Sequence, residues 1–199
     1  MGSIDNDVSD IPGSFGSAKG LPAGIVYTSG TTGIPKGAVL TNGNLTSSVV
    51  QNSYADFGWV KNDRFLGIMP PLIAYGLTCV IVIPLCLGME VFIIPKFEHE
   101  EFANYILKHR PQHVMGVPSY VVRLVNSKEL DGETLDFLKT LVVGGDKMGP
   151  KEEEAANEFL RSHHASCRVT KGYGLTETSS AAVLRDAMSV IKPGMLAFR

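Results

Sequence analysis

The sequence predicts an α/β protein with a parallel, doubly wound sheet flanked by helices. Short apolar runs alternate along the chain with longer amphipathic stretches, a pattern typical of βα units. Some runs contain no polar residue, such as 91–94 and 141–143, which is typical of strands buried on both faces. Three polar, glycine-containing loops follow apolar runs, and ligands of open parallel sheets bind beyond the carboxyl ends of strands. We therefore expect the three loops to share one site.

The composition is that of an ordinary globular protein. The 199 residues are 44% hydrophobic and 19% charged, with a net charge of −2. This allows one domain with a sizeable core and gives no general nucleic-acid footprint. The three cysteines lack metal-ligand spacing and predict free thiols in a reducing compartment. No signal-peptide pattern is evident, so we expect a cytoplasmic protein. From the net charge we expect no nucleic-acid partner.

The stretch from Phe65 to Met89 contains no charged side chain and raises the question of a membrane span. Prolines and glycines interrupt it, and its continuous part, Tyr75 to Ile83, is far shorter than the ~20 residues that a spanning helix needs. A buried strand, a turn and a core helix are the better interpretation. Peripheral contact with a membrane stays open if the substrate is a lipid, and the oligomeric state is not indicated.

The first half of the chain predicts strands around a polar loop, followed by two helices. Residues 1–20 are rich in Gly, Ser and Asp and predict a flexible lead. Asn42 is a candidate helix cap, and Pro84 is expected to kink the second helix or cap an earlier end. The predicted elements are a buried strand at 24–28, a strand at 38–41, a helix at 44–57, a strand at 65–69 and an apolar helix at 75–87.

The second half continues the alternation of strands and helices. The predicted elements are strands at 91–94, 114–117, 141–143 and 167–170 and helices at 98–110, 118–125, 134–138 and 150–164. Pro150 fits the first position of its helix, and the loops 144–146 and 172–178 each follow a strand. The five histidines, which form no ligand spacing, are interpreted as lying on helix surfaces or at sheet edges.

The segment Tyr27–Gly37 has the composition of a phosphate-binding loop. It combines four hydroxyl side chains and three glycines with Pro35 and Lys36. Glycines let the backbone approach a ligand closely, and successive backbone N–H groups form an anion-binding concavity. The order of residues does not match a Walker A motif. A plain surface loop is the alternative.

Tyr27–Gly37 resembles the signature loop of the AMP-forming acyl-CoA synthetases, which belong to the adenylate-forming superfamily. The segment Gly172–Thr178 resembles the later adenine- and metal-binding motif of the same family, in the right order and at a fitting distance. The resemblance covers roughly residues 20–194, the middle of a longer family member. It implies part of the N-terminal domain, with a partial AMP-binding domain at 21–194 and a divergent tail at 195–199.

The resemblance implies ATP-dependent activation of a carboxylic acid to an acyl adenylate, followed by transfer to coenzyme A. ATP, Mg²⁺ and coenzyme A are therefore the expected cofactor and co-substrates. Glu177 would bind the metal, and Tyr173 would stack on adenine. The implied ATP-binding residues are Thr28, Ser29, Gly30, Thr31, Thr32, Gly33, Lys36, Gly144, Gly145, Asp146, Gly172, Tyr173, Gly174 and Thr176. For each of these residues the alternative is a purely structural role: a glycine that only forms a turn, a charged side chain in solvent, or an aromatic ring packed in the core.

The sequence also departs from the family pattern. Many relatives carry an aromatic–His pair where this chain has Ile73 and Ala74, so Tyr75 and Gly76 are the substrate candidates that remain. The family's ribose-binding Asp and adenylation lysine fall beyond this chain, and no catalytic residue is assigned. We expect a fatty or similar small carboxylic acid as substrate and little activity from these residues alone. The alternatives are a non-catalytic nucleotide-binding module and an inactive truncated product.

Overall fold

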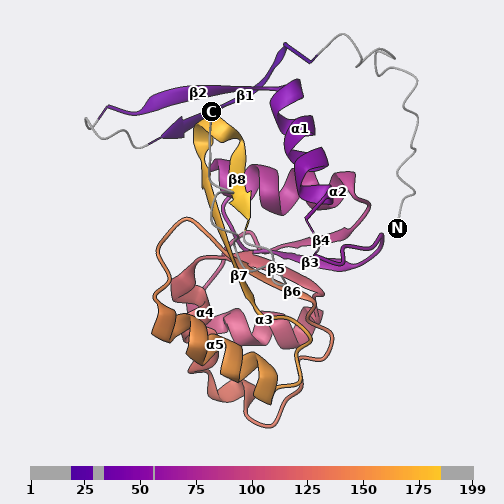
Figure 1. Ribbon diagram of the computed structural model, residues 1–199, viewed down its shortest axis with the longest axis vertical. Coiled ribbons are helices and arrows are strands. Elements are labelled where there is room, and N and C mark those ends of the chain that lie inside the picture. The colour runs from indigo at the N-terminus through magenta and orange to yellow at the C-terminus, as the bar shows by residue number, and fades with distance from the viewer. Residues whose placement is uncertain (1–18, 29–33, 56, 185–199) are drawn as a thin grey trace, which may run out of the picture.

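The computed structural model describes residues 19–28, 34–55 and 57–184 (Figure 1). Nearly all of the predicted lead, the whole tail at 195–199, and Ser29–Gly33 of the phosphate loop lie outside these residues. The described chain forms a six-stranded sheet and a separate two-stranded ribbon. The expectation of an α/β fold with a largely parallel sheet flanked by helices is confirmed.

The sheet has the strand order β4-β3-β5-β6-β7-β8. Its first five strands are parallel, whereas β8 runs antiparallel to β7. The strands are β3 (Arg64–Gly67), β4 (Glu90–Ile93), β5 (His113–Gly116), β6 (Thr140–Val143), β7 (Val169–Leu175) and β8 (Ser180–Leu184).

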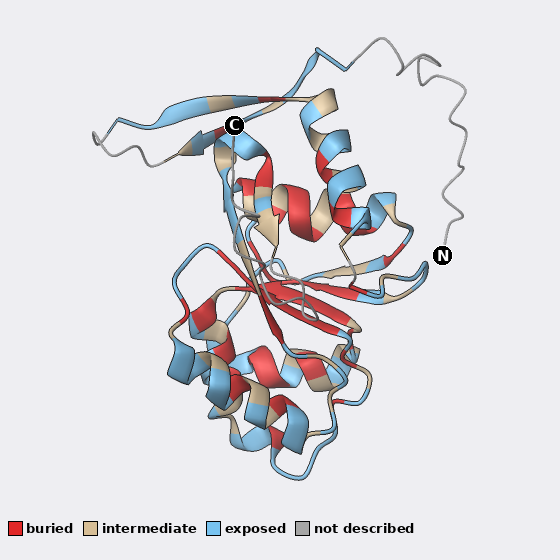
Figure 2. Cartoon of the chain, viewed as in Figure 1, coloured by how far each residue is buried: buried red, intermediate tan, exposed pale blue. Residues whose placement is uncertain are grey.

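Helices cover both faces of the sheet (Figure 2). On one face lie α3 (Phe102–His109), α4 (Pro118–Val125) and α5 (Pro150–Ser162). The other face carries α1 (Asn42–Ser53), a π-helix (Tyr75–Val82) and the α2 helix (Ile83–Cys86) that continues it. Adjacent strand residues alternate between the two cores: Val143 packs in the core beneath α3–α5, and Val142 packs in the core beneath the π-helix. This alternation is expected of strands buried on both faces.

The ribbon differs from the prediction of a buried first strand. β1 (Pro22–Thr28) and β2 (Lys36–Thr41) form an antiparallel pair outside the main sheet. Ile25 is 58% exposed, because only one face of the ribbon is covered. On that face Val26 and Leu40 pack with Ala74 next to the π-helix. The cap of α1 is Thr41 rather than Asn42, since the Thr41 hydroxyl accepts a hydrogen bond from the backbone N–H of Asn44 at 3.1 Å.

Three further expectations were wrong. Residues 134–138 form irregular backbone with a turn at 136–137 rather than a helix, although Leu135 and Leu138 are fully buried. β4 is an edge strand with Ile93 51% exposed, rather than a strand covered on both faces. His113 lies in the middle of the sheet with no exposed surface, instead of at an edge or on a helix.

The apolar stretch from Phe65 to Met89 divides into β3, the π-helix, α2 and their connections, in agreement with the interpretation against a membrane span. Pro84 stands in the first turn of α2, where the helix changes from π to α winding. Across the described residues, no helix has the length and hydropathy needed to traverse a bilayer.

Candidate functional site

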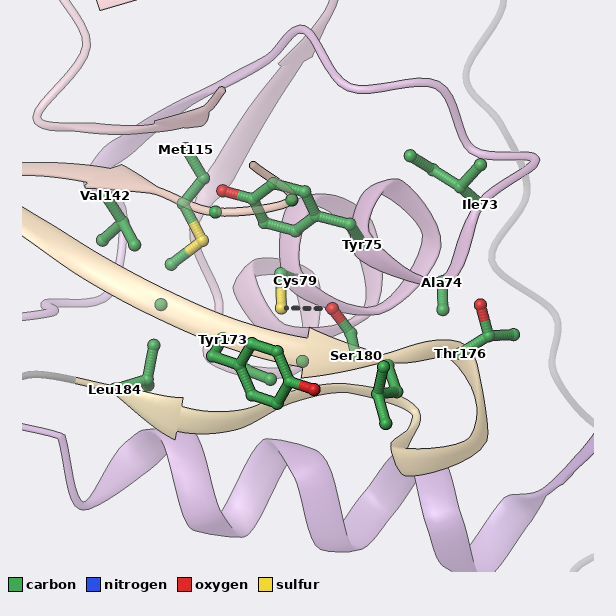
Figure 3. Close-up of a pocket in the computed structure, with 16 residues that line it drawn as sticks. Ile73, Ala74, Tyr75, Cys79, Met115, Val142, Tyr173, Thr176, Ser180 and Leu184 are labelled. Atoms are coloured by element: carbon green, nitrogen blue, oxygen red, sulfur yellow. Dashed lines mark hydrogen bonds between the residues drawn. The ribbon is translucent and has the colours of Figure 1, made fainter. Parts of the chain in front are cut away.

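A cavity of about 160 Å³ lies at the carboxyl end of the sheet, between the π-helix and the β7–β8 hairpin (Figure 3). Its walls come from segments far apart in sequence. Tyr75 and Cys79 face it from the π-helix, and Met115 and Val142 line it from β5 and β6. The lining also includes four of the predicted glycines: Gly144, Gly145, Gly172 and Gly174. Thus β6, β7 and the substrate candidate Tyr75 contribute to one cavity.

Tyr75 is held in place by the end of β5. Its hydroxyl donates a hydrogen bond of 3.0 Å to the carbonyl oxygen of Gly116, which also accepts the backbone N–H of Gly144 at 3.0 Å. Burial raises the pKa of the Tyr75 phenol well above its ordinary value, so the group stays neutral and keeps donating. Gly76 does not line the cavity; a Cβ there would lie 1.9 Å from the carbonyl oxygen of Pro70.

Cys79 and Ser180 meet in the inner part of the cavity. Their Sγ and Oγ atoms lie 3.2 Å apart, and both residues are buried (Figure 3). Burial raises the pKa of the Cys79 thiol, although hydrogen bonds with Ser180 and the Ala181 backbone act in the opposite direction. The sulfur is therefore a neutral thiol, and this contact ties the π-helix to β8.

The second motif is a strand and turn rather than a loop. Gly172–Leu175 continue β7 beyond the end of β6 and pair with β8, with an irregularity in register after Tyr173. A Cβ on Gly174 would lie 1.7 Å from the carbonyl oxygen of Ser180, so no side chain fits there. Ser179 and Ser180 both have positive φ, 59° and 103°, which marks a strained turn.

The two predicted motifs lie at the same end of the molecule. Glu177 is exposed in the short 3₁₀ turn Thr176–Thr178, and both β1 and β2 contact that turn (Figure 1). Thr28 of β1 is paired with the exposed Lys36 of β2, and the phosphate loop runs between these two residues in the sequence. Ser29, Gly30, Thr31, Thr32 and Gly33 fall outside the described residues.

The loop after β6 has the geometry that its glycines predict. Gly145 has φ +77°, a conformation that favours glycine. A Cβ on Gly144 would lie 3.2 Å from the carbonyl oxygen of Gly172 and 3.6 Å from the Tyr75 ring. Small residues at this point keep the strand ends close together and the cavity open. Asp146 is exposed, does not line the cavity, and accepts the backbone N–H of Lys147 at 2.7 Å.

The carboxylate of Glu177 is a suitable ligand for a magnesium ion whose other ligands are mainly phosphate oxygens. Mg²⁺ is usually bound by one or two carboxylates together with substrate phosphates and water. Within 19–28, 34–55 and 57–184, no group of three or more acidic, His or Cys side chains forms a ready-made metal site. One exposed carboxylate beside the phosphate-loop strands therefore fits a nucleotide-bridged ion better than a dedicated protein cage.

Several lining residues were missed by sequence reasoning. They are Cys79, Met115, Val142, Ser180, Ala181 and Leu184. The first three carried a usable signal: Cys79 follows Tyr75 by about one helical turn, Met115 directly precedes the strand-end Gly116, and Val142 stands two residues before Gly144. The residues of β8 carried none, because residues 172–178 were interpreted as a loop and no strand was predicted after them.

Comparison with known proteins identifies the family of the chain. The family model described as AMP-binding enzyme matches residues 16–195. A long-chain-fatty-acid–CoA ligase of Bacillus subtilis is 31% identical over 175 residues, which cover 85% of this chain and 30% of the relative. A 4-coumarate–CoA ligase of Humulus lupulus is 33% identical over 154 residues, 76% of this chain and 27% of the relative.

Superposition on solved structures shows that the fold of this chain is that of known acid–CoA ligases. A long-chain-fatty-acid–CoA ligase from Archaeoglobus fulgidus superimposes with a TM-score of 0.74 at 24% identity, covering 88% of this chain and 35% of that one. A malonyl-CoA ligase in complex with methylmalonyl-CoA and AMP has a TM-score of 0.67 at 29% identity, over 80% and 34% of the two chains. This chain spans less than a third of the length of these two ligases, 30% and 27%. Because the family model covers nearly the whole sequence, the chain belongs to the family of AMP-binding enzymes.

Proposed function

We propose that this chain forms the nucleotide- and acyl-binding part of an AMP-forming acid–CoA ligase. The observation that carries the proposal is the convergence of three features at one end of the sheet. These are the ribbon that flanks the phosphate loop, the Glu177 turn in contact with it, and the apolar cavity beside the strand-end glycines. ATP, a carboxylic acid and coenzyme A are the proposed substrates.

The proposed reaction has two steps. A carboxylate oxygen attacks the α-phosphorus of ATP, and the bond to the leaving pyrophosphate breaks to give an acyl adenylate. The coenzyme A thiol then attacks the acyl carbonyl carbon, and the bond to AMP breaks. Phosphoryl chemistry of this kind needs positioning and charge stabilisation more than covalent help. A chain that holds the triphosphate and the acyl group side by side would supply both.

The roles that we assign follow the positions of the residues. Lys36 and Thr28, with residues 29–33 between them in sequence, would hold the β- and γ-phosphates. The strand-end glycines at 144, 145 and 172 and the exposed ring of Tyr173 would receive the adenine at the outer side of the cavity, which leaves its inner part near Cys79 to the acyl group. The Thr176 hydroxyl would contact the α-phosphate. Glu177 would hold a magnesium ion, which when bound supplies positive charge to the phosphates.

The apolar lining supports an acid with an apolar acyl group, of which a fatty acid is one example. None of the 16 lining residues carries a charge. The chain spans about 30% of the length of a relative that it matches, and the resemblance implies that the family's adenylation lysine falls outside the matching positions. We therefore expect these 199 residues alone to form little acyl-CoA from ATP, acid and coenzyme A, a result that a coupled AMP-release assay would measure. Robust turnover would contradict this expectation.

The test of nucleotide binding is calorimetric titration with Mg-ATP. We expect Lys36→Ala to weaken binding about tenfold, the loss of one charge-assisted contact with phosphate. Lys108→Ala is the matched control: Lys108 is also an exposed lysine, but it lies on α3, beneath the opposite face of the sheet. Equal affinity of the two variants would remove Lys36 from the site. Absence of binding to the unmodified chain would overturn the proposed function.

A further inference from the structure

The inner end of the cavity is closed by the core of the protein. Cys79, Met115 and Val142 form its floor, and each is at most 2% exposed. Behind Cys79, Val80 of the π-helix and Ile83 of α2 pack into the same buried cluster. Within the described part of the chain, a bound group would therefore enter from the side of the glycines and the hairpin. It cannot continue through the floor without displacing core residues.

The polar groups near the floor are already paired with each other. The Tyr75 hydroxyl donates to Gly116, and Cys79 contacts Ser180. Among the residues that the structure describes, no charged side chain lines the cavity. A charged group placed there would lose its hydration without gaining a partner, which is costly. The inner cavity is thus suited to an uncharged, apolar group.

The volume sets an upper size for that group. The cavity measures about 160 Å³, close to an engineered apolar cavity of about 150 Å³ that binds benzene. One aromatic ring, or an aliphatic chain of about six carbons with similar volume, would fill it. A long chain would leave most of its length without a place in the described part of the cavity.

We propose that this site selects compact monocarboxylic acids, with an aromatic ring or a short aliphatic chain, over long-chain and dicarboxylic acids. The inference rests on the proposed function, because it identifies the cavity as the acyl site. It narrows the fatty-acid expectation to short chains and names Val142 and Met115 as residues that determine acyl length.

The test uses unreactive adenylates in which a sulfamate replaces the phosphate, titrated calorimetrically into the unmodified chain. We expect the benzoyl and hexanoyl analogues to bind at least about tenfold more tightly than AMP, and the hexadecanoyl and malonyl analogues to bind no more tightly than AMP. Hexadecanoyl or malonyl binding as tight as benzoyl would overturn the inference. So would a benzoyl analogue that binds no better than AMP, while the proposed function would stand. Failure of AMP and every analogue to bind would overturn both.

A pair of variants tests the floor itself. Val142→Ala should enlarge the cavity and improve binding of a 2-naphthoyl analogue at least about fivefold. Val143→Ala is the matched control: Val143 is equally buried at 2% but packs on the opposite face of β6. Melting curves will show that both variants fold. No gain in folded Val142→Ala, or an equal gain in Val143→Ala, would refute the assignment of the floor.

Discussion

Replacing Gly76 by alanine is expected to lower the free energy of unfolding by about 3 kcal/mol or more. The added Cβ would lie 1.9 Å from the carbonyl oxygen and 2.5 Å from the carbonyl carbon of Pro70, and 2.9 Å from the carbonyl oxygen of Met69. These are backbone atoms, so no rotamer change can relieve the overlap. The first turn of the π-helix would have to move away from the end of β3. Thermal unfolding should show a melting temperature lower by roughly 6–12 °C.

Gly24→Ala is the matched control for this substitution. Gly24 lies in β1, and a Cβ added there meets no atom within 4 Å. We expect the unfolding free energy to change by no more than about 0.5 kcal/mol. Equal stability of the two variants would mean that the close approach at Gly76 does not exist in solution. Because Tyr75 precedes Gly76, the first variant should also weaken binding of the benzoyl analogue.

Stability is expected to fall as the pH is lowered below about 6.5, because the fully buried His113 forms a cluster with two charged side chains at the amino-terminal ends of the strands. His113 Nε2 lies 3.0 Å from an Asp63 carboxylate oxygen, and Lys139 Nζ lies 2.9 Å from the same oxygen. His113 Nδ1 is buried and has no partner among the described residues. Protonating His113 would therefore leave an N–H group buried without an acceptor.

Burial lowers the pKa of His113, and the hydrogen bond and charge of Asp63 only partly oppose it. Because the pKa of His113 is lower in the folded state than in the unfolded state, the unfolded state binds the proton at a higher pH. The contribution of neutral His113 to the free energy of unfolding is therefore fully present above about pH 6.5, the ordinary pKa of histidine. Below that pH the free energy of unfolding declines by up to about 1.4 kcal/mol per pH unit, until His113 in the folded protein is also protonated. For Asp63, burial raises the pKa, but the contacts with Lys139 and His113 outweigh burial and lower it. Its contribution is lost at more acidic pH, as pH falls through the folded pKa.

Urea unfolding between pH 8 and 5 will measure this slope. His113→Asn should remove most of the slope between about pH 6.5 and 5, whatever its effect on stability at pH 8. His164→Gln replaces an exposed histidine and should keep the slope. His109, whose pKa burial also lowers, adds a smaller contribution of the same sign. An unchanged slope in His113→Asn would contradict the role of the cluster.

The sequence predicted the parallel part of the fold because those strands are local apolar runs. β5 and β6 carry such runs, and both are buried on both faces as their composition indicates. His113 was misplaced for the same reason: periodicity showed where β5 is, but not that Asp63 and Lys139 lie beside it. Pairing partners from other strands are not visible in a local pattern.

The cavity was predicted only in part. The strand-end glycines and Tyr75 were recognised, whereas the Cys79–Ser180 contact joins residues 101 positions apart in the chain. The glycines of Gly172–Gly174 suggested a loop, but in the structure they permit a hairpin, since Ser180 approaches the Gly174 backbone too closely for a side chain. Glycine content alone does not distinguish a free turn from two strands in tight contact.

The winding of the segment Tyr75–Val82 constrains its length as well as its composition. The hydrogen bonds of a π-helix join residues five apart, one more than in an α-helix. The backbone N–H of Ile83 accordingly donates to the carbonyl oxygen of Thr78. Deleting one residue here would restore α winding and rotate every side chain before the deletion about the helix axis. Tyr75 would then turn away from Gly116, and the cavity would lose one wall. Insertions and deletions in this segment should therefore be more damaging than most single replacements.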